Sequence, residues 1–186
     1  MENNLNNELQ ALIKDHFSGE IALQFTQRLT EGSLTKEENP QSHLCVYFAA
    51  CDFTAKKVFI GHHIKSGEWL FNGGHIDQGE SLHQAVTREI DEEWGTDLDQ
   101  YRLNTPELLT ITPIDNPTKQ TCTLHFDVWF FVNLDLKTFT PDSNKLLKEF
   151  HEVSWMSINK AKELVTDPAT LEALDYINSN YFEIER

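Results

Sequence analysis

The stretch 73–96 constrains the fold of this chain more than any other part of the sequence, and it reads GGHIDQGESLHQAVTREIDEEWGT. Its first seven residues include three glycines, which allow backbone dihedrals and a close approach to a ligand that other residues hinder. Residues 81–94 then place apolar side chains at helical spacing, and the pattern stops at Gly95. The stretch therefore predicts a glycine-rich loop that leads directly into an amphipathic helix.

Three carboxylates lie on one side of this predicted helix. Glu92 and Glu93 follow Glu89 by three and four residues, a spacing that brings side chains together on a helix surface. Carboxylates this close repel one another unless they are compensated, and hard divalent cations that prefer oxygen ligands are the natural compensation. A solvated acidic helix face is the alternative, and it is common in proteins. The glycine loop before the helix favours the metal-binding interpretation.

The spacing within this stretch resembles the signature of the Nudix hydrolase family. That signature is G-x5-E-x7-R-E-U-x-E-E-x-G-U, where U is a bulky aliphatic residue. Thr96 replaces the last aliphatic residue, which is a mild departure. Segments on either side also resemble a Nudix subset, so the likeness covers roughly residues 43–166. The matching residues are Gly74, Glu80, Arg88, Glu89, Ile90, Glu92, Glu93 and Gly95.

The resemblance implies a metal centre at the carboxylate face of the helix. Glu89, Glu92 and Glu93 resemble the carboxylates that bind Mg²⁺, for which Mn²⁺ is a possible substitute. The carbonyl of Gly73 resembles the backbone ligand that often precedes the signature. Asn72 stands where many members have proline, a change that affects the stiffness of the loop without removing a ligand.

The resemblance also implies catalytic roles around that centre, which Glu92 and Glu93 share. Arg88 resembles the arginine that pairs with the glutamates and orients them, and Glu80 resembles the outlying glutamate that supports the site. Some family members use a downstream glutamate as a further metal ligand or as a general base. Glu149 is the candidate here, and a plain surface glutamate is the alternative.

Histidines and one aspartate are the candidate substrate contacts. His125 and Asp127 share one face of a predicted strand and are expected to point into the cleft, and His75 lies at a variable position of the signature. His62 and His63 lie near the glycine loop together with His75. Such a group could bind a transition metal or transfer protons, and the alternative is a set of polar rim residues.

The order of the predicted elements indicates an α+β fold. Helical spacing at 5–17 and 21–32 precedes a region of strands and helices without regular βαβ alternation, which argues against a doubly wound sheet. We expect the Nudix fold, a mixed β-sheet sandwiched between helices, at 41–186 and an N-terminal helical extension at 1–40. The predicted strands are 43–53, 56–64, 67–71, 107–114, 120–135 and 150–157, and the later helices are 158–165 and 169–182.

Charge and cysteine content limit the partners and the compartment. The net charge of −15, from 15 basic and 30 acidic residues without a basic run, disfavours binding to a nucleic-acid polymer. A polyanionic small molecule needs bridging cations, although acidity also serves solubility. The three cysteines form no C-x-x-C pair, which favours a reduced, cytoplasmic protein. The N-terminus does not resemble a signal peptide, and no apolar run suits a membrane span.

Together these features predict metal-dependent hydrolysis of a diphosphate linkage in a nucleoside diphosphate joined to another moiety. The candidate substrates are nucleotides, nucleotide sugars, molecules like ADP-ribose and dinucleotides. Two alternatives remain: a Nudix domain that senses a ligand without turnover, and an enzyme similar to isopentenyl-diphosphate isomerase. Many family members pair into dimers, so a homodimer is possible.

Overall fold

The computed structural model describes residues 4–96, 103–114 and 121–183, and a seven-stranded sheet forms the centre of this part of the chain. The strands are β1 (Ser42–Asp52), β2 (Lys57–His63), β3 (Trp69–Leu70), β4 (Asn72–His75), β5 (Leu108–Pro113), β6 (Leu124–Asn133) and β7 (Phe150–Met156). The helices are α1 (Asn4–His16), α2 (Gly19–Glu31), α3 (Leu82–Trp94), α4 (Ser143–Glu149), α5 (Ile158–Leu164) and α6 (Pro168–Ile177), and the π-helical turn η2 (Asn178–Phe182) continues α6.

Strand β1 organises the mixed sheet. It runs parallel to β6 and antiparallel to β2 and β4, while β7 pairs with β2 and β5 pairs with β6. The register places His43 opposite His125 and Cys45 opposite His75. Three strands therefore bring histidines from distant parts of the sequence to one end of the sheet.

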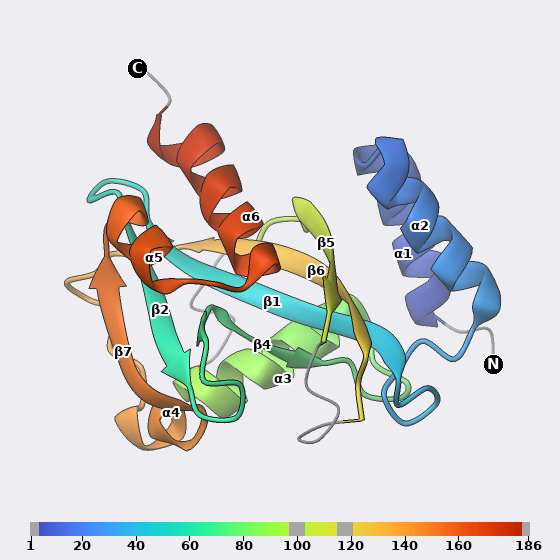
Figure 1. Cartoon of the computed structure of the whole chain (residues 1–186), viewed down its shortest axis with the longest axis horizontal. Helices are drawn as coiled ribbons and strands as arrows, with labels where there is room; N and C mark the ends of the chain where they lie inside the picture. Colours follow the sequence, from blue (N-terminus) through green and yellow to red (C-terminus); the bar gives the residue numbers. More distant parts are fainter. Residues whose placement is uncertain (1–3, 97–102, 115–120, 184–186) are drawn as a thin grey trace.

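Both faces of the sheet are covered, as Figure 1 shows. Alternate residues of β6 belong to two hydrophobic clusters: Val128 and Phe130 face the cluster that includes α3, while Trp129 and Phe131 face the cluster that includes α5 and α6. Alternation along a strand sends successive side chains to opposite faces. The predicted α+β sandwich is therefore confirmed.

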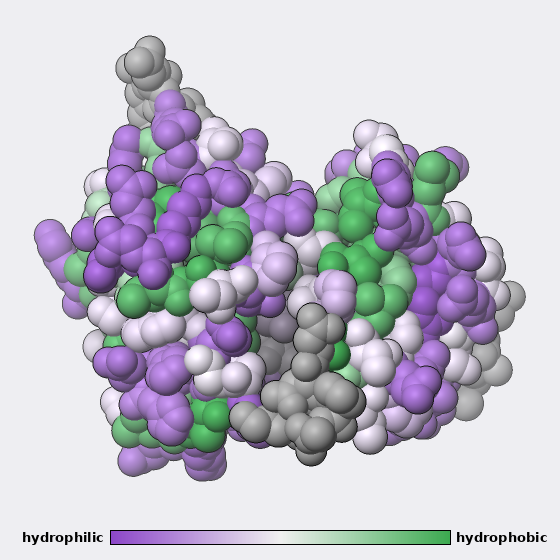
Figure 2. All heavy atoms as spheres, in the orientation of Figure 1, coloured by the Kyte–Doolittle hydropathy of each residue, from purple (hydrophilic) through white to green (hydrophobic). Residues whose placement is uncertain are grey.

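The N-terminal helices pack on the same core as the sheet. Leu9 and Phe25 are fully buried, and the ring of Phe25 meets that of Phe126 edge-to-face at 5.1 Å between centroids. The predicted helices at the N-terminus are confirmed, but they share one hydrophobic cluster with α3 and β6. The division of the chain near residue 40 remains a prediction. Figure 2 shows mainly hydrophilic atoms on the outward surface, with hydrophobic atoms on the flank of the α1–α2 pair that faces α6.

Three segments differ from the expected pattern. Residues 72–75, expected in the glycine-rich loop, form strand β4 because they pair with β1. The pattern did not predict α4, which begins after the N-cap residue Asp142 and buries Leu146. The strand expected over 120–135 is observed as β6 from Leu124, and Gln120 lies outside the described residues. The three cysteines are buried and form no disulfide, and none of the described helices is long and apolar enough to cross a membrane.

Candidate active site

Local sequence determines where the acidic helix α3 begins and ends. The side chain of Ser81 accepts a hydrogen bond from the backbone N–H of Gln84, and the Gln84 side chain accepts one from the backbone N–H of Ser81, which forms a capping box. Gly79 before the helix has φ +91°, and Gly95 after it has φ 67°, the left-handed region that favours glycine. The capping box and the two glycines therefore fix where α3 begins and ends.

Arg88 joins the loop to the helix. Its Nε and Nη2 donate to the two carboxylate oxygens of Glu80 at 2.8 and 2.9 Å, and Nη2 also donates to the carbonyl of His75 at 2.9 Å. Its Nη1 donates to Oε1 of Glu89 at 2.7 Å and reaches Oε2 of Glu92 at 3.5 Å. These bonds, first of all those with Glu80, raise the pKa of Arg88 further, so the guanidinium remains a fixed positive charge.

Gly74 leaves space for the Glu89 carboxylate. A Cβ atom at Gly74 would clash with both oxygens of that carboxylate. Glu89 is buried, and burial raises its pKa despite the hydrogen bond from Arg88. For Glu80 the balance is opposite: burial raises the pKa, but the bonds from Arg88 and from the Asp77 backbone outweigh it and lower the pKa overall. Glycine at position 74 thus allows the carboxylate to sit directly against β4.

Glu93 is the most deeply buried of the three helix carboxylates, with 5% of its surface exposed. Its Oε2 accepts a hydrogen bond from the side chain of Asn72, and its Oε1 accepts one from the backbone N–H of Gly73 at 3.4 Å. Burial raises the pKa of Glu93 to about 8, with a further contribution from the negative charge of Glu89. The carboxylate is therefore held in place but under-compensated.

Glu92 is oriented differently from its two neighbours. Its side chain is 58% exposed, whereas Glu89 and Glu93 are buried. Among the described residues, the groups of metal-ligating atoms that lie within 4.8 Å of one another do not include this trio. The three carboxylates line one wall without meeting at a point, as mutual repulsion favours.

The carboxylates open onto a cavity of about 920 Å³. Glu89, Glu92 and Glu93 line it together with Gly73 and Gly74. This volume lies in the range of small-molecule sites, and the position at the glycine loop is the one that the sequence predicts. The cavity therefore has room for a nucleotide-sized ligand beside the acidic wall.

Glu149 lies at the junction of α4 and β7 and lines the same cavity. It forms an ion pair with Lys65 at 2.9 Å, and its negative charge contributes to the raised pKa of Glu93. Nε2 of His63 lies 3.6 Å from the same carboxylate, but burial lowers the pKa of this ring. Lys148 and Lys145 line the cavity as well. The structure thus places Glu149 with the helix carboxylates and surrounds it with cationic side chains.

The three expected substrate contacts do not share one environment. His75 and His125 line the cavity, and burial lowers their pKa values to about 3 and about 4, so both rings are neutral at physiological pH. Asp127 is fully buried, is not among the cavity-lining residues, and accepts hydrogen bonds from Thr110 and Thr112. The expectation that Asp127 points into the cleft does not hold, because β5 covers that side chain.

Sequence reasoning missed the role of Asn72. The sequence pattern at this position indicated only an effect on the stiffness of the loop. Its amide instead contacts a carboxylate 21 residues further along the chain. A polar residue directly before two glycines and after an apolar segment was the available signal. Lys148 likewise gave little local sign that α4 would carry it to the cavity.

The Asn72 amide supports the carboxylate that metal binding would use. We expect Asn72→Ala to weaken Mn²⁺ binding by about 10–100-fold, since residues that orient metal ligands have effects of that size. Isothermal titration of the metal-free protein measures the affinity, and Asn180→Ala, in the C-terminal turn, provides a control. Equal affinity in Asn72→Ala and wild type would contradict the supporting role.

The raised pKa of Glu93 also predicts a pH dependence of stability. The folded protein holds this proton up to about pH 8, whereas an unperturbed glutamate releases it near 4.5. The folded state therefore binds more protons between these values, so this group's contribution to the free energy of unfolding falls as pH rises through that window. Glutamine has no proton to lose in this window. As pH rises from 5 to 9, we therefore expect the free energy of unfolding of Glu93→Gln to increase by about 2–5 kcal/mol relative to that of the metal-free wild type. Urea unfolding of both proteins tests this, and parallel curves would contradict it.

Comparisons with known proteins agree with this geometry. The family model of the NUDIX domain matches residues 29–176. A search of curated protein sequences gives no significant match. The matched region contains the glycine loop, all three helix carboxylates and Glu149. The chain therefore belongs to the NUDIX family, as its sequence signature indicates.

Solved structures with the same fold have low sequence identity to this chain. The E. coli dihydroneopterin triphosphate pyrophosphohydrolase superposes with a TM-score of 0.63 at 18% identity, over 74% of this chain and 95% of its own. A C. elegans Ap4A hydrolase in a binary complex has a TM-score of 0.53 at 14% identity, with 73% and 96% covered. The MutT protein of Methanosarcina mazei Go1 has a TM-score of 0.52 at 20% identity, with 75% and 97% covered. These likenesses establish the Nudix fold.

Proposed function

We propose that the protein hydrolyses a diphosphate linkage in a nucleoside diphosphate joined to another moiety, with Mg²⁺ or Mn²⁺ as cofactor. The observation that carries this proposal is the buried, under-compensated Glu93 next to Glu89 on the wall of the cavity. Once both are ionised, two buried carboxylates with one guanidinium among several acidic groups carry a local excess of negative charge. Uncompensated buried charge destabilises a fold, so this arrangement indicates that a bound cation neutralises the carboxylates.

The donor set fits a hard divalent cation. Glu89, Glu92 and Glu93 offer carboxylate oxygens at the cavity, and Mg²⁺ is usually held by few carboxylates together with water and substrate phosphates. Gly73 lines the cavity at the position where the resemblance implies a backbone ligand. Exposed Glu92 has freedom to rotate toward its buried neighbours. When bound, the cation neutralises phosphate charge and lowers the pKa of water.

The protein's own residues would position and deprotonate the attacking water. Glu93 and Glu149 both line the cavity, and each is a candidate to accept the proton while the water attacks one phosphorus atom. Arg88 would keep Glu80 and Glu89 in place without touching the substrate. Positioning and charge stabilisation would then supply most of the rate enhancement.

Cationic side chains support the choice of a polyphosphate substrate. Lys65, Lys145 and Lys148 line the cavity of a chain whose net charge is −15. His75 and His125, as neutral rings on the same cavity, are the proposed contacts for the rest of the substrate. The neighbours named as a dihydroneopterin triphosphate pyrophosphohydrolase and an Ap4A hydrolase support a substrate of this general kind.

The proposed function includes a cellular compartment, a partner and an oligomeric state. Three unbridged cysteines favour a reducing compartment, so we propose a cytoplasmic location. A small phosphorylated molecule is the proposed partner, and neither a nucleic-acid polymer nor a membrane is part of the proposal. A homodimer is the proposed assembly, and size-exclusion chromatography with light scattering tests it.

A substrate panel tests the proposal. The protein would be incubated with Mg²⁺ and ADP-ribose, nucleotide sugars, NADH, diadenosine polyphosphates, nucleoside triphosphates or coenzyme A, and phosphate would be measured after phosphatase coupling. We expect metal-dependent turnover of one substrate class. Ligand binding without product would favour the sensor alternative. A rearranged diphosphate without hydrolysis would favour the isomerase alternative.

A further inference from the structure

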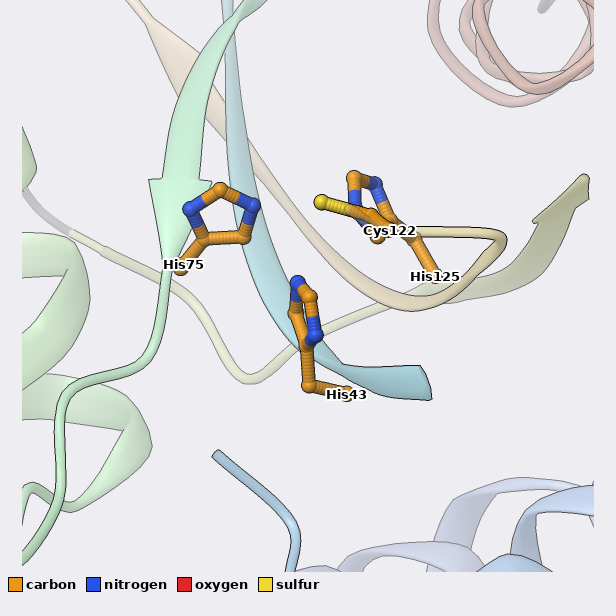
Figure 3. Close-up of side chains that lie close together, drawn as sticks. All are labelled: His43, His75, Cys122 and His125. Carbon is orange, nitrogen blue, oxygen red and sulfur yellow. The ribbon is translucent and has the colours of Figure 1, made fainter. Parts of the chain in front are cut away.

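We propose that His43, His75, Cys122 and His125 form a second metal site, distinct from the carboxylate site, that binds a transition metal such as Zn²⁺. One ligand atom from each residue lies within 4.8 Å of the others. Figure 3 shows the four side chains pointing toward a common centre, with the Cys122 sulfur directed toward His75. The inference does not depend on the proposed hydrolysis.

Two of the four residues have buried nitrogens without a hydrogen-bond partner. Within the described part of the chain, Nε2 of fully buried His43 and Nε2 of His125, a residue 7% exposed, lack any partner. A buried polar atom without a partner costs free energy, so native proteins rarely retain one without a reason. Two such atoms beside a buried thiol indicate that a ligand completes the group.

The tautomer of His43 suits metal binding. Its Nδ1 lies 3.0 Å from the backbone carbonyl of Asn39. A carbonyl only accepts, so Nδ1 carries the proton, and Nε2 of the neutral ring keeps its lone pair toward the cluster. A metal-bound histidine usually donates its other ring N–H to a carbonyl or carboxylate in this way. The backbone at Asn39 therefore fixes His43 in the orientation that a metal ligand needs.

The donor types and geometry favour a borderline transition metal over Mg²⁺. Three imidazoles and one thiolate match the nitrogen and sulfur ligands of tetrahedral Zn²⁺. Bonds of roughly 2.0–2.3 Å place tetrahedral ligand atoms roughly 3.3–3.8 Å apart, and the four candidate ligand atoms already lie within 4.8 Å of one another. Cys122 would bind as the thiolate and release its proton. His75 would bind through the ring nitrogen that faces the cluster and carry its one ring proton on Nδ1, so the Lys36 ammonium would move away from that atom.

One positive charge lies beside the cluster. The Nζ of Lys36 is 3.5 Å from Nδ1 of His75, the ring atom that Figure 3 shows turned away from Cys122, so the ammonium contacts the side of the ring opposite the cluster. A neighbouring group formed by Cys45, His125 and Asp127 offers three ligands, but Asp127 already accepts hydrogen bonds from two threonines. The four-residue group is the more complete site.

The sheet supplies the scaffold for this site. His43 and His125 are register partners on β1 and β6, while His75 ends β4 and Cys122 precedes β6. An ion there would tie three strands together at the rim of the cavity that His75 and His125 also line. The ion would bind the imidazole nitrogens that would otherwise be available to a substrate. Its binding would therefore hold the His75 and His125 rings in place at the rim of the cavity.

Cobalt substitution tests the proposal in the full chain. Co²⁺ would be added to the metal-free protein in excess Mg²⁺, which occupies carboxylate sites and competes poorly for thiolate. We expect one equivalent of Co²⁺ with tetrahedral d–d absorption and a thiolate-to-metal charge-transfer band, both bleached by Zn²⁺. Cys122→Ser should lose the charge-transfer band, and His43→Gln should bind about 10-fold more weakly or worse. Cys51→Ser, another buried free thiol, should match wild type.

Two results of the Co²⁺ titration would overturn the four-residue metal site. Absence of the charge-transfer band in folded wild type would overturn the proposal whatever the variants do. Loss of the band in Cys45→Ser, together with its retention in Cys122→Ser, would place the metal in the neighbouring group and would also overturn it. Circular dichroism checks that each variant is folded, and His43→Gln provides the test if Cys122→Ser is not.

Discussion

We expect the Glu93→Gln variant to lose about 10³-fold in kcat, the range that removal of a general base or of a metal-binding carboxylate produces. Glutamine has the same shape and keeps one acceptor for Asn72 or Gly73, but it cannot carry the negative charge. Because that buried charge destabilises the metal-free fold, the variant should be as stable as wild type or more so. Loss of activity without loss of stability is the signature of a functional carboxylate.

A matched set of variants makes this prediction specific. Glu20→Gln, on the exposed surface of α2, removes one negative charge far from the cavity and should keep full activity. Glu149→Gln distinguishes the candidate bases, because the variant that lacks the base should lose the acidic limb of the pH–rate profile. Wild-type kcat in Glu93→Gln would show that the carboxylate assignment is wrong.

The second large effect is expected at Arg88. Arg88→Lys keeps the charge but replaces a planar fork that donates to Glu80, Glu89 and the His75 carbonyl by a single ammonium. Unsatisfied carboxylates would then remain beside the glycine loop. We expect the free energy of unfolding to fall by about 2–3 kcal/mol and kcat/KM to fall by about 10²-fold as the glutamates lose their orientation.

Arg28 provides the control that separates stability from activity. It is buried in the N-terminal region and donates to the carbonyls of Gly32, Ser33 and Ser42. Arg28→Lys should therefore cost similar stability while the folded protein keeps its turnover. If both variants retained wild-type kcat/KM at a temperature where each is folded, Arg88 would be a structural residue only.

Local pattern was sufficient to predict helix α3 and the identity of its carboxylates. The apolar spacing, the cap residue Ser81 and the terminal Gly95 are all signals within a few residues of the helix. Helix geometry placed the three glutamates on one side but could not assign their environments. Burial of Glu93 and exposure of Glu92 depend on how α3 packs against β4. That strand lies about 20 residues earlier in the sequence, outside the helical pattern.

Contacts set by strand pairing could not be predicted. The alternation in β6 gave the correct faces, yet whether Asp127 met a cleft or another strand depended on where β5 paired. The cluster of His43, His75 and His125 likewise results from the registers of β1 with β4 and β6. Sequence reasoning grouped His75 with its local neighbours instead, because register between distant strands leaves no local signal.

Turnover in ¹⁸O-labelled water tests the central claim most directly. The wild-type protein with Mg²⁺ would be incubated with the substrate panel, and products would be examined by ³¹P NMR and mass spectrometry. Hydrolysis predicts new phosphate monoesters in which one product carries a single ¹⁸O on phosphorus, with no product when metal is removed. Unchanged substrates across the panel, or products without ¹⁸O, despite normal Mg²⁺ binding, would contradict a metal-dependent diphosphate hydrolase.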